Sequence, residues 1–418
     1  MRALILDIKP LSWALCKALS SVWPEAVLSS LGGLRLVEGP APELPGDDWV
    51  RVRTLLGGIC GTDLAILAQK QRPSSILQAY SSTPMGLGHE NVAVVESVGP
   101  TVEGSWVGRR VCVEPTLSCV PRGIEPVCEC CRRGAFGACE NFDADGIGRY
   151  GLPPGTSIGY NSRTGGAYGE RFVAHVSQLV PVPDGLTDEQ AVLTDPLACS
   201  LHAVLRADLS AKTPSAVLVC GGGILGLGCV AALRATGYAG TIDLAARYEF
   251  QAALGRQMGA SEIVLGRART PRERFAEVAS RTGGRVREVR FGNLMLSGGY
   301  DIVFDCVGSI QSLSECTKWA AGRGKVVLVG TGHGVGVDWT PVWFRELTIL
   351  GAYGRQVEHW SGRRVSTYQL VHELMQSGKL PTLGLLTHRF PLTDYRRAFA
   401  TALHKNHQGT VRVAFEFR

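Results

Sequence analysis

The sequence predicts an α/β protein in which a β-rich domain is combined with a doubly wound α/β domain. Two observations support this fold class. Residues 1–185 are rich in glycine and proline and carry short alternating apolar and polar runs, for example at 50–54 and 92–96. Such alternation between turns indicates half-buried strands. From about residue 187 the apolar runs become nearly continuous and alternate with helical segments, which is typical of parallel strands covered on both faces.

The second half of the chain supplies the elements of the doubly wound domain. Strands are predicted at 216–220, 242–245, 301–304, 325–329 and 347–350, and helices at 224–236, 249–259, 271–281 and 309–321. The final part of the chain returns to mixed character, and we expect it to pack on the first domain. The segment 266–299 is longer than an ordinary strand connection, so it is expected to form a surface insertion or an interface element.

The composition is that of an ordinary globular protein. The 418 residues are 45% hydrophobic and 19% charged, and the net charge of +6 is spread along the chain. No block of Lys and Arg is interleaved with aromatic residues, which argues against nucleic-acid binding. No run reaches the ~18 uninterrupted apolar residues that a membrane span requires, and charged residues interrupt the apolar N-terminus. We therefore expect a cytoplasmic protein that binds neither nucleic acid nor membrane.

A glycine-rich motif, Gly-Gly-Gly-Ile-Leu-Gly, follows the first predicted strand of the α/β domain and opens the next helix. In this context it satisfies the G-x-G-x-x-G pattern of a dinucleotide site. Gly221 permits the tight turn, Gly223 lets the backbone approach a pyrophosphate, and Gly226 allows close packing of helix on strand. The amides of Gly223, Ile224 and Leu225 are expected to face the phosphates at the positive end of the helix dipole.

The residue about 20 positions after this motif predicts which nicotinamide cofactor binds. An NAD site normally has Asp or Glu there, whereas this chain has Ala246 followed by Arg247. The missing carboxylate removes repulsion toward a ribose 2′-phosphate, and Arg247 can pair with that phosphate. NADP(H) is therefore predicted over NAD(H). The alternative is Asp243, which could bind the ribose if the strand ends earlier.

A group of cysteines in the first half of the chain predicts a structural zinc site. Cys128 and Cys131 form a C-x-x-C pair, and Cys139 follows after seven intervening residues. Four thiolates at about 2.3 Å close the coordination sphere of zinc and hold together a loop that lacks an apolar core. Three residues are candidates for the fourth ligand. Cys119 is the first choice, and Cys130 and Glu125 are the alternatives.

Cys60 and His89 supply a second set of metal donors. Cys60 lies in Gly-Ile-Cys-Gly-Thr-Asp, and His89 lies 29 positions later in Gly-Leu-Gly-His-Glu, with Glu90 beside it. A thiolate and an imidazole from separate loops suit Zn²⁺, and a site with three protein ligands leaves room for substrate. The pair is weak evidence by itself, but the nucleotide loop and the cysteine group elsewhere in the chain strengthen the metal interpretation.

The order of these motifs resembles that of the zinc-dependent medium-chain dehydrogenases, the family of the alcohol, sorbitol and threonine dehydrogenases. Further stretches that support the resemblance lie at 36–44, 165–170, 191–197 and 304–308. The resemblance covers nearly the whole chain. It implies a GroES-like catalytic domain made of residues 1–186 and 347–418, with a Rossmann nucleotide-binding domain at 187–346 inserted between them, and an active site between the two domains.

The resemblance also assigns roles to the first metal set. Cys60 and His89 match the first two ligands of the catalytic zinc, and Thr62 matches the hydroxyl residue that hydrogen-bonds the substrate oxygen. Glu90 matches the carboxylate next to the metal, which binds it directly or holds its water. Asp195 falls where the polyol and sugar branch usually has Glu and where simple alcohol dehydrogenases have Cys. Either Asp195 or Glu90 is therefore expected to be the third ligand.

One position departs from the family pattern. The family often has His five residues after the first ligand, as part of a proton relay, and this chain has Ala65 there. The proton is therefore expected to leave from Thr62 through water or the cofactor ribose. His202 is expected to pack within a helix and not to bind metal.

The resemblance implies hydride transfer between NADP(H) and the carbinol or carbonyl carbon of a small hydroxylated substrate, such as a polyol, sugar or cyclitol. Zinc would act on the substrate hydroxyl as a Lewis acid, and Thr62 would accept the proton. A simple alcohol or aldehyde substrate is the first alternative. A zinc-free quinone or enoyl reductase of the same superfamily and a nucleotide-binding protein without turnover are the others. A homodimer or homotetramer is expected, because both are usual in the family.

Overall fold

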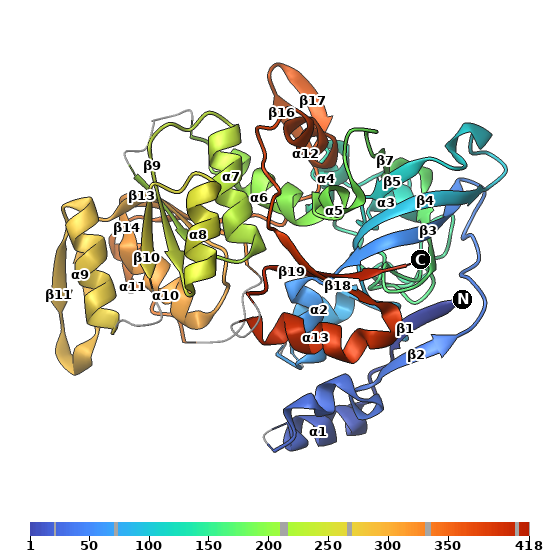
Figure 1. Ribbon diagram of the computed structural model, residues 1–418, viewed down its shortest axis with the longest axis horizontal. Coiled ribbons are helices and arrows are strands. Elements are labelled where there is room, and N and C mark those ends of the chain that lie inside the picture. Colours follow the sequence, from blue (N-terminus) through green and yellow to red (C-terminus); the bar gives the residue numbers. More distant parts are fainter. Residues whose placement is uncertain are drawn as a thin grey trace. The chain divides into compact units, whose positions relative to one another are not determined.

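The computed structural model describes residues 1–20, 22–70, 74–209, 216–265, 270–330, 336–405 and 409–417 (Figure 1). The chain divides into two compact units. The first comprises Met1–Asp195, Arg355–His372 and Leu385–Arg418, and the second comprises Pro196–Gly354 and Glu373–Gly384. Among the described residues, no helix combines the length and the apolar character needed to cross a membrane.

The first unit is built around a mostly antiparallel sheet. Its described strands follow the order β18-β19-β3-β4-β5-β7, and β6 pairs with β3. Their bounds are β3 (Trp49–Gly58), β4 (Glu90–Val98), β5 (Arg110–Val113), β6 (Arg171–His175), β7 (Leu179–Pro181), β18 (Leu386–Pro391) and β19 (Arg412–Glu416). One core lies against this sheet, where Trp49, Val52 and Phe172 are fully buried.

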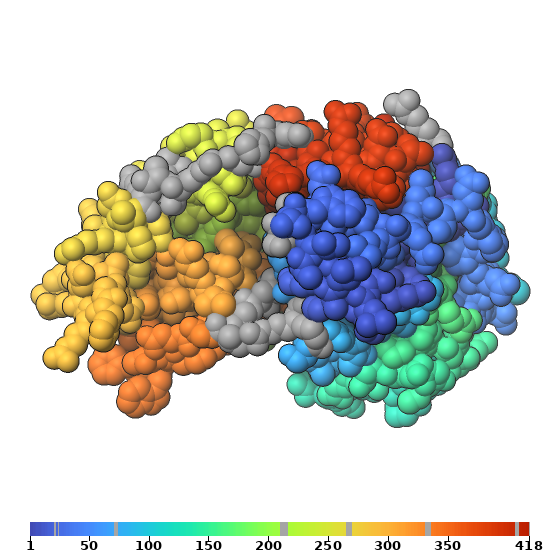
Figure 2. Space-filling model, turned by 90° about the horizontal axis from the view of Figure 1, so that it is seen from below, coloured from blue at the N-terminus to red at the C-terminus, as the bar shows by residue number. Residues whose placement is uncertain are grey.

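The two ends of the chain meet in this unit. Strand β1 (Arg2–Leu6) pairs with β2 (Leu34–Glu38), and a second core joins Leu4 of β1 to Phe399 of α13 (Tyr395–Leu403) and Phe415 of β19. Figure 2 shows the surfaces of the N-terminal segment, in blue, and the C-terminal segment, in red, side by side. The last strand, β19, therefore lies inside the sheet between β18 and β3.

The remaining elements of the first unit are short. They are α1 (Pro10–Leu19), α2 (Gly61–Leu67), α3 (Cys119–Arg122), α4 (Glu129–Arg132), α5 (Asp188–Ala191), β16 (Val357–Trp360) and β17 (Arg363–Ser366). Two helices, α6 (Thr194–Arg206) and α12 (Thr367–Gln376), begin in the first unit and continue in the second.

The second unit confirms the predicted doubly wound domain. The strands of its six-stranded sheet are β8 (Ala216–Cys220), β9 (Thr241–Ala246), β10 (Glu262–Leu265), β13 (Tyr300–Asp305), β14 (Ala320–Leu328) and β15 (Thr348–Gly351). They are parallel and lie in the order β10-β9-β8-β13-β14-β15. Counted along the chain this is 3-2-1-4-5-6, the order of a Rossmann sheet, in which ligands bind at the carboxyl ends of the strands where the order reverses.

The helices of the second unit agree with the predicted segments within a few residues. The four that were predicted are α7 (Ile224–Ala235), α8 (Glu249–Gln257), α9 (Pro271–Thr282) and α10 (Ile310–Trp319), and the short α11 (Thr340–Phe344) was not predicted. The described part of the predicted insertion, 270–299, contains α9 followed by a hairpin of β11 (Arg285–Glu288) and β12 (Leu294–Ser297). Residues 266–269 lie outside the described residues.

Candidate metal centres and cofactor site

The register of β3 and β4 brings the first set of donors together. Gly58, the last residue of β3, pairs with Glu90, the first residue of β4, because the two strands are antiparallel neighbours. Cys60 is the second residue after the end of β3, and His89 immediately precedes β4. One sulfur, one imidazole nitrogen and one carboxylate oxygen of Cys60, His89 and Glu90 lie within 4.8 Å of one another. We call these three residues the first centre.

Glu90 has the surroundings expected of a carboxylate that binds a metal ion. Its carboxylate is buried, and Oε1 accepts a hydrogen bond from Arg412 Nη2 at 2.5 Å. Oε2 is also buried but has no hydrogen-bond partner among the described residues. Burial raises the pKa of Glu90 well above its usual range, although the charge of Arg412 opposes the shift. A buried acceptor without a partner suits a metal ion, which would bind the oxygen and stabilise its charge.

Asp63, which the sequence analysis did not single out, lies close to both Cys60 and His89 of the first centre. Its Oδ2 accepts a hydrogen bond from the Cys60 amide at 3.2 Å, and its Oδ1 lies 3.8 Å from His89 Nδ1. The hydroxyls of Tyr160 and Tyr168 donate to the same carboxylate at 2.7 and 2.5 Å. A carboxylate behind a metal-binding imidazole commonly fixes the orientation of the ring. The motif Cys-Gly-Thr-Asp contained this signal, because Asp63 sits one turn after Cys60.

Thr62 and Ala65 lie on α2, directly after Cys60. Thr62 is in the first turn and is partly exposed, so its hydroxyl remains accessible. Ala65 is buried, with 5% of its surface exposed, and its methyl group cannot carry a proton. Thr62 therefore presents a hydroxyl group on α2, whereas Ala65 presents no group that could accept a proton.

Asp195, the alternative third ligand, has a different environment from Glu90. It lies at the start of α6, in the first unit, and is buried. Arg355 donates to both carboxylate oxygens, through Nε to Oδ1 at 2.8 Å and through Nη2 to Oδ2 at 3.1 Å. Tyr368 donates its hydroxyl to Oδ1 at 2.6 Å. Burial acts to raise the pKa of Asp195, but the charges of Arg355 and His89 and these hydrogen bonds hold it below its usual value. Asp195 is not one of the residues whose donor atoms cluster in the first centre.

The four cysteines Cys119, Cys128, Cys131 and Cys139 form a second cluster of donor atoms. Short helical turns present them, since Cys119 begins α3, Cys131 lies in α4 and Cys128 directly precedes α4. The Sγ atoms of Cys119 and Cys139 are 3.7 Å apart, and those of Cys128 and Cys139 are 4.0 Å apart. Four sulfurs arranged tetrahedrally at about 2.3 Å from zinc lie about 3.8 Å from one another. The cluster therefore has the dimensions of a closed four-thiolate zinc site, and it contains Cys119 but not Cys130 or Glu125.

We call the segment 119–139, which carries the four clustered cysteines, the cysteine lobe. It contains a buried arginine, Arg122, that the sequence analysis missed. Arg122 is fully buried, and its guanidinium donates to the carbonyl oxygens of Leu117, Phe142, Ala144, Leu152, Pro153 and Gly155. Burial lowers its pKa to about 10, while the thiols of Cys139 and Cys119 and the carboxylate of Asp143 act in the opposite direction. Arg122 thus ties the loop that follows the last cysteine to the helix that carries the first.

The glycine-rich loop of the second unit lies at the carboxyl end of β8. Gly221 follows the strand with φ +109°, a conformation that a residue with a side chain rarely adopts. A side chain at Gly226 is excluded, because its Cβ would lie 1.7 Å from the carbonyl oxygen of Gly221. Gly223 immediately precedes α7, so the amides of Ile224 and Leu225 are at the N-terminus of a 12-residue helix, where phosphate binds.

The residues predicted to choose the cofactor lie on and after β9. Asp243 is in the middle of this strand and is buried, and its Oδ2 accepts a hydrogen bond from Tyr300 at 2.6 Å. Arg247 is the first residue after the strand and is exposed. Its guanidinium carbon lies 5.6 Å from the centre of the Tyr248 ring, and that ring stacks on Phe250. Arg247 is therefore available at the strand end, whereas Asp243 is engaged inside the sheet.

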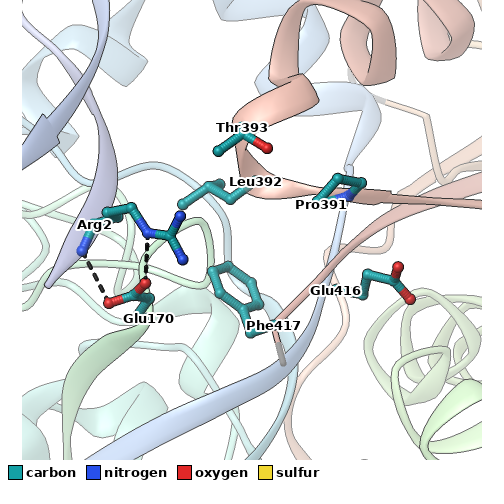
Figure 3. Close-up of a pocket in the computed structure, with 7 residues that line it drawn as sticks. All are labelled: Arg2, Glu170, Pro391, Leu392, Thr393, Glu416 and Phe417. Atoms are coloured by element: carbon teal, nitrogen blue, oxygen red, sulfur yellow. Dashed lines mark hydrogen bonds and ion pairs between the residues drawn. The ribbon is translucent and has the colours of Figure 1, made fainter.

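A surface pocket of the first unit lies apart from these residues. Figure 3 shows it between the start of the chain and its end, lined by Arg2, Glu170, Pro391, Leu392, Thr393, Glu416 and Phe417. Arg2 Nε already donates to Glu170 at 2.8 Å. The pocket contains none of the predicted metal or cofactor residues, so it is not a candidate active site.

Comparison with known proteins agrees with the fold and identifies the family. The model of the alcohol dehydrogenase GroES-like domain matches residues 46–184, and that of the zinc-binding dehydrogenases matches 225–370. A sorbitol dehydrogenase of Arabidopsis thaliana is 29% identical over 84% of this chain and 85% of its own length. An L-threonine 3-dehydrogenase of Pectobacterium carotovorum is 27% identical over 96% of this chain and 100% of its own. The crystal structure of galactitol-1-phosphate dehydrogenase from Escherichia coli has a TM-score of 0.71 at 20% identity, with 100% of both chains covered.

The two domain models and the relatives define an enzyme of the dehydrogenase class. The chain belongs to the zinc-dependent medium-chain dehydrogenases, as the order of its motifs indicated.

Proposed function

We propose that this protein transfers a hydride between NADP(H) and the carbinol or carbonyl carbon of a small polyol- or sugar-like substrate, with zinc at the first centre. The observation that carries the proposal is the cluster of the partly exposed Cys60 with the buried His89 and Glu90, in which Glu90 Oε2 has no hydrogen-bond partner among the described residues. Three protein donors leave a coordination position for substrate, whereas the four thiolates of the cysteine lobe leave none.

The residues around the first centre fit this chemistry. When bound, zinc polarises the substrate oxygen as a Lewis acid, and the nicotinamide cofactor accepts or donates the hydride. Thr62 accepts the proton of the substrate hydroxyl, since it lies two residues after Cys60 on the partly exposed start of α2. Ala65 offers no next acceptor on the helix, so the proton passes from Thr62 to water or the cofactor ribose. Arg412 donates to Oε1 of Glu90, and Oε2 has no hydrogen-bond partner among the described residues.

The proposed substrate class rests on the relatives and on the buried charges. Two of the similar proteins are named for a polyol and a polyol phosphate, and a third for a hydroxyamino acid. At the sequence position where the polyol and sugar branch of the family usually has Glu, the chain carries a carboxylate, Asp195, and not a thiol. Polar groups of this kind favour a substrate with several hydroxyls over a simple apolar alcohol.

The proposed NADP(H) preference rests on Arg247. This residue is exposed at the end of β9, and the neighbouring Tyr248 ring supports its guanidinium. Guanidinium groups pair well with phosphate, and no carboxylate stands at this position to repel it.

The experiment is a panel of polyols, sugar alcohols and simple alcohols, assayed with NADP⁺ and with NAD⁺. We expect turnover of hydroxyl-rich substrates with NADP⁺. Arg247→Ala should lower kcat/KM for NADP⁺ by about 10- to 100-fold, as the loss of a charged hydrogen bond implies, with little change for NAD⁺. Arg256→Ala, an exposed arginine on the following helix α8, serves as the matched control. A clear preference for NAD⁺ would contradict the cofactor proposal, and turnover of simple alcohols alone would contradict the substrate class.

A further inference from the structure

Asp195 lies where the family pattern expects a third metal ligand. Both oxygens of its carboxylate, however, already accept hydrogen bonds from other side chains. Arg355 binds the carboxylate in a two-pronged arrangement, and Tyr368 adds a third hydrogen bond. All three side chains are buried, with 3%, 4% and 2% of Asp195, Arg355 and Tyr368 exposed. Paired charges shielded from water in this way hold each other firmly, because separating them would leave each buried and uncompensated.

The backbone around Arg355 has an unusual conformation and is held by a hydrogen bond to α12. Arg355 has φ +62°, in the left-handed region that residues with side chains rarely adopt. The next residue, Gln356, is tied to the start of α12, since its carbonyl accepts a hydrogen bond from the Thr367 amide at 2.9 Å. Tyr368 follows Thr367 on the same helix. Arg355 and Tyr368 are therefore fixed to each other, and a strained conformation retained in such a setting indicates a role for the side chain.

Glu90 and Asp195 differ in the property that decides which of them binds a metal. Glu90 has a buried oxygen without a partner among the described residues, whereas each oxygen of Asp195 accepts at least one charged hydrogen bond. Hydrogen bonds to Arg355 and Tyr368 fix the Asp195 carboxylate outside the donor cluster of the first centre, so it would have to move from this arrangement to bind the same metal as Cys60, His89 and Glu90. A third anionic ligand, besides Cys60 and Glu90, would also outweigh the charge of Zn²⁺ and weaken its pull on a substrate oxygen.

We propose that Arg355 and Tyr368 form a clamp that keeps the Asp195 carboxylate out of the coordination sphere, so that the metal has Cys60, His89 and Glu90 as its protein ligands and one position open for substrate. This inference rests on the proposed function, because it requires a metal at the first centre. Arg355 is a positioning residue in this account and acts on the metal only through Asp195.

The test follows the metal itself in protein loaded with Co²⁺, whose visible absorption reports the ligands. Cys60→Ser protein provides the blank, since its remaining cobalt signal comes from the cysteine lobe. In Arg355→Met the released Asp195 should bind the metal, which changes the absorption of the first centre and slows metal release to a chelator by about tenfold, the scale of effects from groups around metal ligands. Tyr368→Phe should shift both readouts in the same direction but less. This milder variant keeps the test usable if Arg355→Met fails to fold.

Two variants of Asp195 decide the outcome. Asp195→Asn in the otherwise unchanged protein should leave the cobalt spectrum and the metal content of the first centre as they are. The double variant Arg355→Met/Asp195→Asn should restore the parental spectrum, because no carboxylate is left to bind. Loss of metal in Asp195→Asn, or parental spectra and release rates in both Arg355→Met and Tyr368→Phe, would overturn the clamp. If Cys60→Ser has the same metal content and spectrum as the parent, the proposed function itself fails, which is a different result.

Discussion

Arg412 is the residue that balances charge at the first centre. It is buried, with 6% of its side chain exposed, and it pairs with Glu90 while its Nη1 donates to the Ile59 carbonyl at 2.6 Å. Strand β19 carries Arg412 to this place and pairs with the end of β3, next to Cys60. Without a metal, Arg412 supplies the charge that opposes the effect of burial on Glu90.

We therefore predict that Arg412→Met destabilises the metal-free protein more than the zinc-loaded protein. Removing one partner of a buried ion pair costs about 3–5 kcal/mol, and zinc should recover part of this loss because it stabilises the same carboxylate. Calorimetric unfolding of the chelator-treated and zinc-loaded variants measures the difference. Arg389→Met is the control, since Arg389 and Glu189 are 48% and 47% exposed, and such pairs contribute about 0–1 kcal/mol. Equal losses with and without zinc would show that Glu90 does not bind the metal.

At the scale of elements, the cysteine lobe consists of short helices and loops, and we expect its stability to depend on a bound metal and on Arg122. Helices α3 and α4 have four residues each, too few to be stable alone. The guanidinium of Arg122 donates hydrogen bonds to six carbonyl oxygens of the described residues and to no carboxylate among them. A zinc ion with four thiolates carries a net negative charge, which favours a buried cation nearby.

Arg122→Met should accordingly loosen the lobe and hasten the loss of its zinc. We expect a loss of about 3–5 kcal/mol, because six carbonyl oxygens lose their donor and several stay buried. A colorimetric chelator measures zinc release at constant temperature, and calorimetry measures stability. Arg133→Met is the matched control, since Arg133 adjoins α4 but its side chain is 75% exposed. Release rates that are the same in the two variants would rule out a role for Arg122 in holding the lobe.

The elements differ in how well the sequence could predict them. Strands β8, β9 and β13 are nearly continuous apolar runs, and they lie where the sequence analysis placed them. Strand β10 was missed, because Glu262–Leu265 has only four residues and follows closely on a helix. The hairpin β11–β12 was also missed, since Arg285–Glu288 has a single apolar residue and alternation cannot be recognised from it.

At the scale of the whole molecule, the first centre is assembled from residues far apart in the chain. Motifs predicted Cys60, His89 and Glu90, because each lies in a short pattern with a recognisable chemistry. The supporting residues Arg355 and Arg412 come from the other end of the chain and lie in no such pattern. Their roles depend on the parallel and antiparallel pairing of distant strands and on the return of the C-terminus to the first sheet. A single sequence contains no direct sign of such long-range contacts.

We assign one metal to each of two chemically different centres. We propose that catalysis takes place at the open centre of three donors and that a metal in the closed centre of four thiolates stabilises the cysteine lobe. The two can be separated, because they share no ligand.

Zinc content per chain is the most direct test of this assignment. Purified protein should contain about two zinc ions per chain, Cys60→Ser about one, and Cys128→Ser should lose the other, as expected for independent open and closed sites. Turnover should disappear in Cys60→Ser while the cysteine lobe keeps its metal. A parent protein without zinc, or a Cys60→Ser variant with unchanged zinc content and turnover, would contradict the assignment of the catalytic metal to Cys60, His89 and Glu90.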